Sequence, residues 1–222
     1  MNSEATLEGT SSFSIRKTLY FIIKRLFDII CSLIGCLFLL PIAILVKISY
    51  ILNKDYASIF FSQDRIGKNG KTFKFYKFRS MVVDADKVLE ELLKNDKEAN
   101  REYKLNKKLK NDPRITKMGK ILRKTSLDEL PQLINVLKGD MSLIGNRPYL
   151  PREKEDMGES FETIVKTKPG LTGYWQVNGR SNTIFEERLK LEEYYSNHAS
   201  LKMDIKILFK TVYVVLFHKG AE

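Results

Sequence analysis

Apolar positions are concentrated in one uninterrupted run near the start of the chain. Residues 29–46 read IICSLIGCLFLLPIAILV and carry no charge, a length that meets the usual threshold for a membrane segment. Pro41 lies inside this run, where it removes a helical hydrogen bond and predicts a kink. Lysines and arginines flank the run on both sides, which favours entry and exit through one membrane face. The pattern supports a re-entrant hairpin and a full span about equally, because spanning helices also tolerate proline.

The remaining chain carries shorter patterns typical of strands and helices. Residues 58–82 alternate apolar and polar positions around Gly67 and Gly70, which predicts a β-hairpin. Helical periodicity then predicts helices over the ranges 84–109, 114–124, 130–137, 186–195 and 203–217. The helix at 114–124 has one apolar and one basic face, as in helices that lie in a lipid headgroup layer.

These elements predict an α+β fold that is mainly helical. The expected organisation is a disordered tail over residues 1–18, a membrane segment over 19–54 and a folded domain over 55–222. The hairpin and the amphipathic helices would then surround a site at the membrane surface.

Charge and side-chain inventory narrow the classes of function. Lys and Arg number 38 against 27 Asp and Glu, a net charge of +11 that indicates an anionic partner such as nucleic acid, lipid headgroups or phosphorylated substrates. Cys31 and Cys36 are the only cysteines, and His198 and His218 the only histidines. This inventory disfavours a disulfide framework, a Cys/His metal site and a Ser-His-Asp triad.

The strongest candidate for chemistry is the pair of adjacent carboxylates Asp128 and Glu129. Pro131 follows them and is tolerated only in the first turn of a helix, so the pair is expected at or near a helix N-terminus. A carboxylate there, beside cations, is a competent nucleophile toward phosphorus and a competent Mg²⁺ ligand. The structural alternative is a capping box formed by Ser126 and Glu129.

Basic residues beside glycines are the second candidate set. Arg147 and Arg180 adjoin glycine-rich stretches that are able to bind phosphate through backbone amides, although both known phosphate-loop spacings are absent. Lys77 and Arg79 belong to the basic-aromatic stretch 74–81, which is typical of nucleic-acid binding or of a strand with core and solvent faces. Arg123 lies on the basic face of the helix at 114–124.

Taken in order, these stretches resemble the bacterial monotopic phosphoglycosyl transferases over about residues 20–218. The resemblance is carried by KRLFD at 24–28, QDRIG at 63–67, YKFRSM at 76–81, Arg123, SLDELPQ at 126–132, NVLKGDMS at 135–142 and KPGLTG at 168–173. It implies a re-entrant membrane helix broken at Pro41, with the catalytic domain on the cytoplasmic face of the bacterial inner (plasma) membrane.

The resemblance also implies the reaction. Asp128 would attack the sugar-linked phosphate of a UDP-sugar, expel UMP and pass the sugar phosphate to undecaprenyl phosphate. Mg²⁺ would be required, with Asp128 and Glu129 as its ligands. Substrate binding would fall to a basic set comprising Lys77, Arg79, Arg123, Arg147 and Arg180. Anionic lipids are further expected partners, nucleic acid is not, and a homo-oligomer stays open.

Two positions depart from the family pattern. Leu40 replaces a serine that often precedes the proline, and Asn146 replaces the first proline of the family's Gly-Pro-Arg-Pro motif, which is expected to loosen that turn. The sugar is undetermined among galactose, glucose and N-acetylated hexoses. The rival hypotheses are a membrane-tethered nucleic-acid-binding protein, whose binding would weaken steeply with salt and not depend on Asp128, and a purely structural membrane protein.

Overall fold

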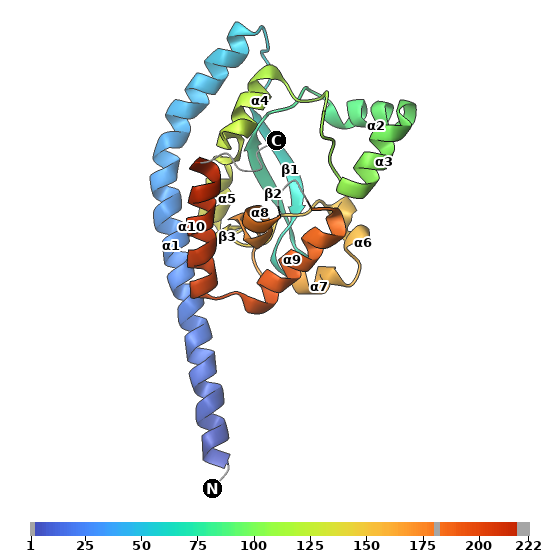
Figure 1. The fold of residues 1–222 in the computed structure, drawn as a ribbon. Helices are drawn as coiled ribbons and strands as arrows, with labels where there is room; N and C mark the ends of the chain where they lie inside the picture. The colour runs from blue at the N-terminus through green and yellow to red at the C-terminus, as the bar shows by residue number, and fades with distance from the viewer. Residues whose placement is uncertain (1–2, 180–182, 217–222) are drawn as a thin grey trace.

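One long helix, α1 (Ser3–Leu52), runs along the side of the molecule (Figure 1). The computed structural model describes residues 3–179 and 183–216. The helix continues through Pro41, so the predicted break at this proline is wrong, although Figure 1 shows α1 bending in its C-terminal half. A bend is enough to accommodate Pro41 within a continuous helix, because it relieves the clash of the proline ring with the preceding turn. The flanking apolar residues keep their helical hydrogen bonds. Helix also occupies residues 3–18, where the sequence predicts a disordered tail, since propagation from a formed helix costs little.

The segment Lys17–Leu52 of α1 is long and apolar enough to cross or anchor a membrane. Most of its large apolar side chains are exposed on the protein surface, with Leu37, Leu40 and Leu45 among the most exposed. An exposed apolar surface of this extent marks a membrane or protein interaction surface.

The predicted β-hairpin is confirmed. β1 (Phe60–Ile66) pairs antiparallel with β2 (Thr72–Phe78) around the 3₁₀ turn η1 (Lys68–Gly70). A second, parallel pair joins β3 (Ser142–Ile144) to β4 (Gly170–Thr172). These two small sheets and their surrounding helices confirm a mainly helical α+β fold.

Short helices surround the strands (Figure 1). In chain order they are α2 (Ala85–Asn95), α3 (Lys97–Asn106), α4 (Lys117–Lys124), η2 (Leu127–Glu129), α5 (Gln132–Lys138), η3 (Pro151–Glu153), α6 (Lys154–Met157), α7 (Ser160–Ile164), α8 (Tyr174–Asn178), α9 (Phe185–His198) and α10 (Leu201–Leu216). The single helix predicted over 84–109 is wrong. It is divided at Asp96, whose carboxylate accepts the backbone N–H groups of Glu98 and Ala99 and begins α3 as its N-cap.

Polar side chains of α1 fasten this helix to the body. Arg25 donates from its two terminal nitrogens to carbonyls of the last turn of α5, at 2.6 and 2.8 Å. Asp28 is buried and accepts the backbone N–H of Leu143 at 2.8 Å. Lys24 pairs with buried Asp204 of α10 at 2.5 Å. Charged groups inside an apolar helix are therefore turned toward protein partners, and the apolar side chains are left facing outward.

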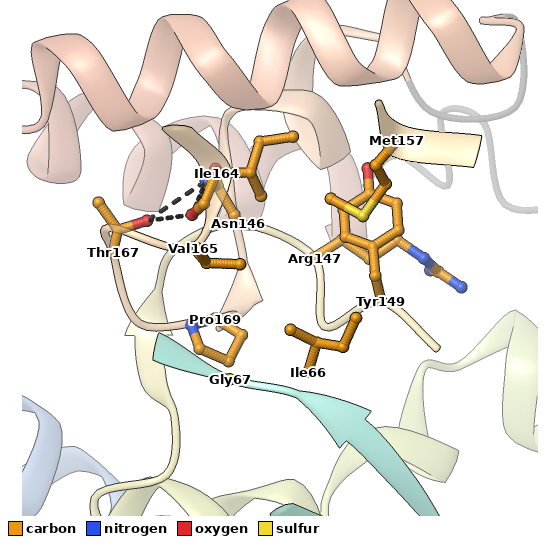
Figure 2. A pocket seen from close by; sticks show the side chains of 10 residues that line it. All are labelled: Ile66, Gly67, Asn146, Arg147, Tyr149, Met157, Ile164, Val165, Thr167 and Pro169. Carbon is orange, nitrogen blue, oxygen red and sulfur yellow. Dashed lines mark hydrogen bonds between the residues drawn. The ribbon is translucent and has the colours of Figure 1, made fainter. Parts of the chain in front are cut away.

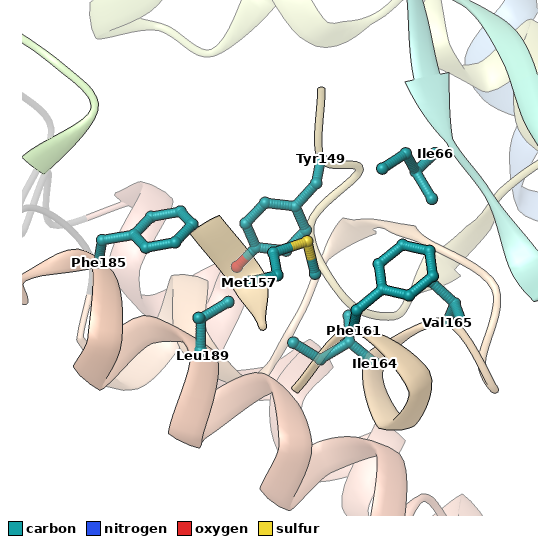
Figure 3. Close-up of a cluster of buried hydrophobic side chains, with 8 residues drawn as sticks. All are labelled: Ile66, Tyr149, Met157, Phe161, Ile164, Val165, Phe185 and Leu189. Carbon is teal, nitrogen blue, oxygen red and sulfur yellow. The ribbon is translucent and has the colours of Figure 1, made fainter. Parts of the chain in front are cut away.

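Two apolar clusters fix the parts that carry the functional side chains. One joins α1, β2 and α4 through Val46, Tyr50, Ile59, Phe78 and Leu122. The other joins the end of β1 to Tyr149, α6, α7 and α9, and Figure 3 shows its side chains. Its members are Ile66, Tyr149, Met157, Phe161, Ile164, Val165, Phe185 and Leu189.

Candidate active site

The carboxylates Asp128 and Glu129 share one lysine. Lys77 of β2 places its Nζ 3.5 Å from an oxygen of Asp128 and 3.2 Å from an oxygen of Glu129. Asp128 is buried, with 5 % of its surface exposed, whereas the Glu129 side chain is 37 % exposed. The structure therefore brings together three predicted site residues from segments about 50 residues apart in the sequence.

The carboxylates lie in the short turn η2, directly before α5. Ser126 precedes the turn with a positive φ of 57° and makes no side-chain cap hydrogen bond. The alternative of a Ser126–Glu129 capping box is therefore wrong, and Glu129 is directed to Lys77 instead. The predicted position near a helix N-terminus is confirmed, but α5 has only seven residues, so the dipole contributes less than the neighbouring cations do.

Arg123 completes the polar surroundings of Asp128 from α4. Its Nε donates to Ser80 Oγ at 2.9 Å. α4 packs closely against the backbone of Ser80, and this contact depends on Gly119. A Cβ at position 119 would come within 1.8 Å of the Ser80 carbonyl oxygen. Thr116 caps the same helix by accepting the Gly119 N–H. A glycine and a cap thus set the position of an arginine beside the carboxylates.

Burial dominates the electrostatics of the site. It raises the pKa of Asp128, and Glu129 raises it further, while Lys77 and Arg123 oppose both effects. Burial likewise lowers the pKa of Arg123, opposed by Asp128. Asp128 is therefore a desolvated carboxylate whose charged form depends on two cations, a pattern common at functional sites.

The carboxylates of Asp128 and Glu129 are also the candidate ligands for a metal ion. Among the described residues, no group of three or more His, Cys, Asp or Glu side chains is placed to hold a metal ion. Mg²⁺ is commonly bound by one or two protein carboxylates together with substrate phosphates and water. The Asp128–Glu129 pair fits that incomplete set, and Glu129 is the more accessible of the two.

Arg79, predicted to bind substrate, makes its contacts with the protein itself. Its guanidinium makes two bonds to Asp55, at 2.8 and 2.9 Å, and its Nε donates to the Ser58 carbonyl at 2.7 Å. The same group stacks over the Tyr50 ring. The guanidinium of Arg79 thus holds the end of α1 against β2. Arginine suits this role because its planar head group donates two parallel hydrogen bonds to one carboxylate. The cations of the basic-aromatic stretch are thus paired with carboxylates of the protein.

Arg147 lies after β3, in a different group of charges from the carboxylate pair. Its backbone N–H donates to both oxygens of buried Glu192, at 3.0 and 3.2 Å. Arg180 lies outside the described residues.

The glycine-rich stretch at 168–173 is used for backbone pairing. The N–H of Gly145 donates to Thr172 and that of Gly170 to Asn146, at 2.9 and 2.7 Å, so these amides are not available to a phosphate. Asn146, expected to loosen its turn, instead donates to Ile164, Thr167 and Ser196.

One small pocket among the described residues lies away from the carboxylates. It is lined by Ile66, Gly67, Asn146, Arg147, Tyr149, Met157, Ile164, Val165, Thr167 and Pro169 (Figure 2). Figure 2 shows the Arg147 guanidinium directed past the Tyr149 ring and away from Asn146 and Thr167. This narrow gap within the core is too small for a substrate, so the chemistry is assigned to the carboxylates on the grounds of charge and geometry.

Three charged residues near Arg147 were missed by sequence reasoning, namely Arg65, Arg188 and Glu192. Arg188 and Glu192 lie on one face of α9 and are both buried. The available signal was two charged residues spaced four apart within a predicted helix, a pattern that usually indicates a solvated pair.

Comparison with known proteins identifies relatives across almost the whole chain. The family model described as bacterial sugar transferase matches residues 19–218. An undecaprenyl-phosphate galactose phosphotransferase of Salmonella typhimurium is 46 % identical over 199 residues, covering 90 % of this chain and 41 % of that protein. An exopolysaccharide production protein, ExoY, of Sinorhizobium fredii is 40 % identical over 198 residues, covering 89 % of this chain and 87 % of that protein.

A more distant relative is the UDP-glucose:undecaprenyl-phosphate glucose-1-phosphate transferase of Escherichia coli. It is 37 % identical over 209 residues, which cover 90 % of this chain and 41 % of that protein. The chain thus spans less than half the length of several curated relatives that it matches.

Proposed function

Because this chain belongs to the bacterial sugar transferase family, we propose that it transfers a hexose-1-phosphate from a UDP-sugar to undecaprenyl phosphate and releases UMP. The observation that carries the proposal is the buried carboxylate of Asp128, held beside Glu129 by Lys77 and Arg123. The relatives' names refer to undecaprenyl phosphate and to both galactose and glucose. The proposal therefore does not specify the sugar, which the assay described below identifies.

The first step forms a covalent aspartyl intermediate. An Asp128 oxygen attacks the phosphorus that carries the sugar, and the bond between this phosphorus and the bridging oxygen of the diphosphate breaks. UMP leaves with the electron pair of that bond. Lys77 stabilises the ionised, attacking form of Asp128 and is positioned to meet the negative charge on phosphoryl oxygens.

The second step regenerates the carboxylate. An oxygen of undecaprenyl phosphate attacks the same phosphorus, the bond to Asp128 breaks, and the lipid leaves with a new diphosphate linkage to the sugar. The transfer energy of the donor is conserved in the acyl phosphate between the two steps. Mg²⁺, held by the carboxylates and substrate phosphates, would neutralise phosphoryl charge.

The membrane arrangement is part of the proposal. In this arrangement α1 contacts the lipid through its exposed apolar side chains, and both of its ends stay on the same membrane face. The basic residues on both flanks of the apolar segment favour the cytoplasmic side for both of its ends. Asp128 then lies where a water-soluble nucleotide sugar meets a lipid phosphate, and the net charge of +11 suits both substrates and an anionic leaflet.

The reaction is tested with the full chain in detergent micelles. UMP release is measured with undecaprenyl phosphate and a panel of UDP-galactose, UDP-glucose and N-acetylated UDP-hexoses. We expect release with at least one donor, its abolition by Asp128→Asn, and normal release from the control Asp64→Asn, whose carboxylate is exposed and pairs with Lys74. Full turnover by Asp128→Asn would rule out the covalent route.

The topology is tested separately with single cysteines placed near residues 8 and 60 in a chain that lacks Cys31 and Cys36. A membrane-impermeant thiol reagent added to intact cells should label neither position. Labelling of only one of them would mean that α1 spans the membrane.

A further inference from the structure

A buried amide follows the two carboxylates on the same helical backbone. Gln132 is the first residue of α5, four residues after Asp128, and only 2 % of its surface is exposed. Leu130 and Pro131 both have right-handed helical φ and ψ, so the backbone stays helical from η2 into α5. Residues four apart on such a backbone share a face, with Cβ atoms about 5–6 Å apart. The Gln132 side chain is therefore within reach of the Asp128 carboxylate.

Both ends of this helical face are bonded to β2. Asp128 pairs with Lys77 at 3.5 Å. Asn135, three residues after Gln132, donates to the Lys74 carbonyl at 2.6 Å. α5 lies beside β2 in Figure 1, and the two elements are in contact. Gln132 thus lies between two contacts with β2, on the face that carries Asp128.

The amide of Gln132 has a donor that the chain does not use. Its Nε2 is buried and has no hydrogen-bond partner among the described residues. Asn135 differs, because its amide is bonded at both ends, to the Lys74 carbonyl and to the Tyr76 N–H. Burying a donor without a partner is unfavourable, and a purely structural role gives nothing in return. The free N–H of Gln132 therefore indicates an acceptor that the reaction supplies.

The Asp128 carboxylate has an unused acceptor close to this donor. Its Oδ2 meets Lys77, whereas its Oδ1 accepts no hydrogen bond from any residue that the structure describes. Arg123, the second cation beside Asp128, gives its Nε to Ser80 at 2.9 Å. Oδ1 is therefore the oxygen best suited to attack phosphorus, and the Gln132 amide is a neutral donor within reach of the same carboxyl group.

We propose that Gln132 is a further catalytic residue, whose side-chain N–H donates to the Asp128 oxygen that leaves phosphorus in the second step. The proposal rests on the covalent transfer reaction proposed above. In that step an oxygen of undecaprenyl phosphate attacks the phosphorus, the bond from phosphorus to Asp128 Oδ1 breaks, and its electron pair returns to Oδ1. The amide keeps its proton, and the regenerated carboxylate accepts the hydrogen bond.

This donor acts on the second step rather than on the first. An oxygen bonded to phosphorus is a poor acceptor, and it becomes a better one as it gains negative charge in the transition state. The hydrogen bond is then stronger in the transition state than in the intermediate, which is the condition for catalysis. In the first step the same oxygen loses charge as it attacks, so the hydrogen bond gives no help. Removal of the N–H should therefore slow transfer to the lipid and leave formation of the intermediate unaffected.

Gln132→Met tests the proposal by separating the two steps, because methionine keeps the length of the side chain and removes its N–H groups. The full chain in detergent micelles is mixed with Mg²⁺ and a UDP-sugar that the wild type accepts, and then with undecaprenyl phosphate. UMP release reports the first step, and intact-protein mass spectrometry follows loss of the phosphosugar adduct in the second. We expect an unchanged burst of UMP and an adduct that decays about tenfold or more slowly than in the wild type.

Two controls distinguish catalysis from structure. Gln63→Met makes the same substitution at a glutamine of β1 that accepts a hydrogen bond from Arg65 at 3.1 Å, and its adduct should decay at the wild-type rate. Gln132→Met should keep or raise the thermal midpoint of the wild type, because it removes a buried amide nitrogen that has no partner among the described residues. Asn135→Met should lower the midpoint, because two hydrogen bonds to β2 are lost.

The proposal and the transfer reaction fail in different ways. If the wild type forms the adduct and Gln132→Met discharges it at the same rate, Gln132 is not catalytic and the reaction stands. Loss of the UMP burst in Gln132→Met, or a midpoint lowered as in Asn135→Met, would assign the side chain to the folded site and also overturn the proposal. Lipid product from a wild type that never carries an adduct would refute the covalent reaction itself, and the role of Gln132 with it.

Discussion

Replacing Lys77 with methionine tests how the site keeps the proposed nucleophile, Asp128, charged. Methionine retains the apolar stem of lysine and removes the only cation within 4 Å of both carboxylates among the described residues. Burial and Glu129 already raise the pKa of Asp128, and Lys77 opposes them. The substitution should therefore raise the pKa of Asp128 further and leave less of its ionised form on the acid side of the pH profile.

The size of the effect follows from the distance and the exposure. Unit charges 3.5 Å apart attract by about 5 kcal/mol at an effective dielectric constant of about 20. Because the Lys77 side chain is 26 % exposed, solvent screening leaves about 1–2 kcal/mol of this. Since 1.4 kcal/mol corresponds to one pKa unit, the acid limb of the pH–rate profile should move up by about one unit, and transfer should fall by about tenfold at pH values below that limb.

The pH profile separates this effect from a lost substrate contact. If Lys77 acts on Asp128, the acid limb of UMP release moves to higher pH in Lys77→Met, and part of the rate returns as the pH is raised. Lys74→Met is the control, because Lys74 lies on the same strand with an exposed partner. An equal loss of rate at every pH, with the limb unmoved, would refute the electrostatic argument and assign Lys77 to substrate binding only.

Three further predictions concern stability, measured by unfolding in micelles. Arg79→Lys should lower the free energy of unfolding by about 1.5–3 kcal/mol in urea titrations without changing the donor KM, because the bonds to Asp55 are structural; a raised KM would contradict this. Glu192→Gln should remove a pH dependence of the free energy of unfolding. Because burial raises the folded pKa of Glu192 to about 8, the native wild type holds a proton that the unfolded chain releases. The stability of the wild type therefore falls by up to about 1.4 kcal/mol per pH unit from about pH 5 to 8. Urea titrations at pH 5, 7 and 9 check this, and parallel curves for both proteins would contradict it. Arg25→Gln should lower the thermal midpoint by several degrees, because the carbonyls at the end of α5 lose two charged donors, and an unchanged midpoint would count against the fastening of α1.

The sequence predicted those parts of the fold that depend on local periodicity. The hairpin was foreseeable because residues 58–82 alternate in character around two glycines. The helix is divided at Asp96 because the Asp96 side chain caps α3 instead of occupying an interior position of one long helix. The free-energy difference between these two arrangements is about 1 kcal/mol, and the apolar periodicity does not reveal it. The same holds for Ser126, whose left-handed backbone displaced the expected cap.

The site was predictable only in part, because distant partners decide what a charge does. Adjacent carboxylates before a proline predicted a position near a helix start for Asp128 and Glu129, and the structure has them there. Lys77 and Arg79 look equivalent in the sequence, but their side chains have different partners. Lys77 pairs with the carboxylates of the site, whereas Arg79 pairs with Asp55. Arg65 and Arg188 were not identified because their unpartnered nitrogens exist only once three distant elements have packed together.

The central claim is that Asp128 becomes covalently bonded to the donor's phosphorus. The most direct measurement is intact-protein mass spectrometry of the chain mixed with a UDP-sugar and Mg²⁺ in the absence of lipid acceptor, followed by fragmentation to locate the adduct. The proposal predicts one added hexose phosphate on Asp128, which disappears when undecaprenyl phosphate is added and never forms in Asp128→Asn. Formation of lipid product with an unmodified chain at every time point would contradict it.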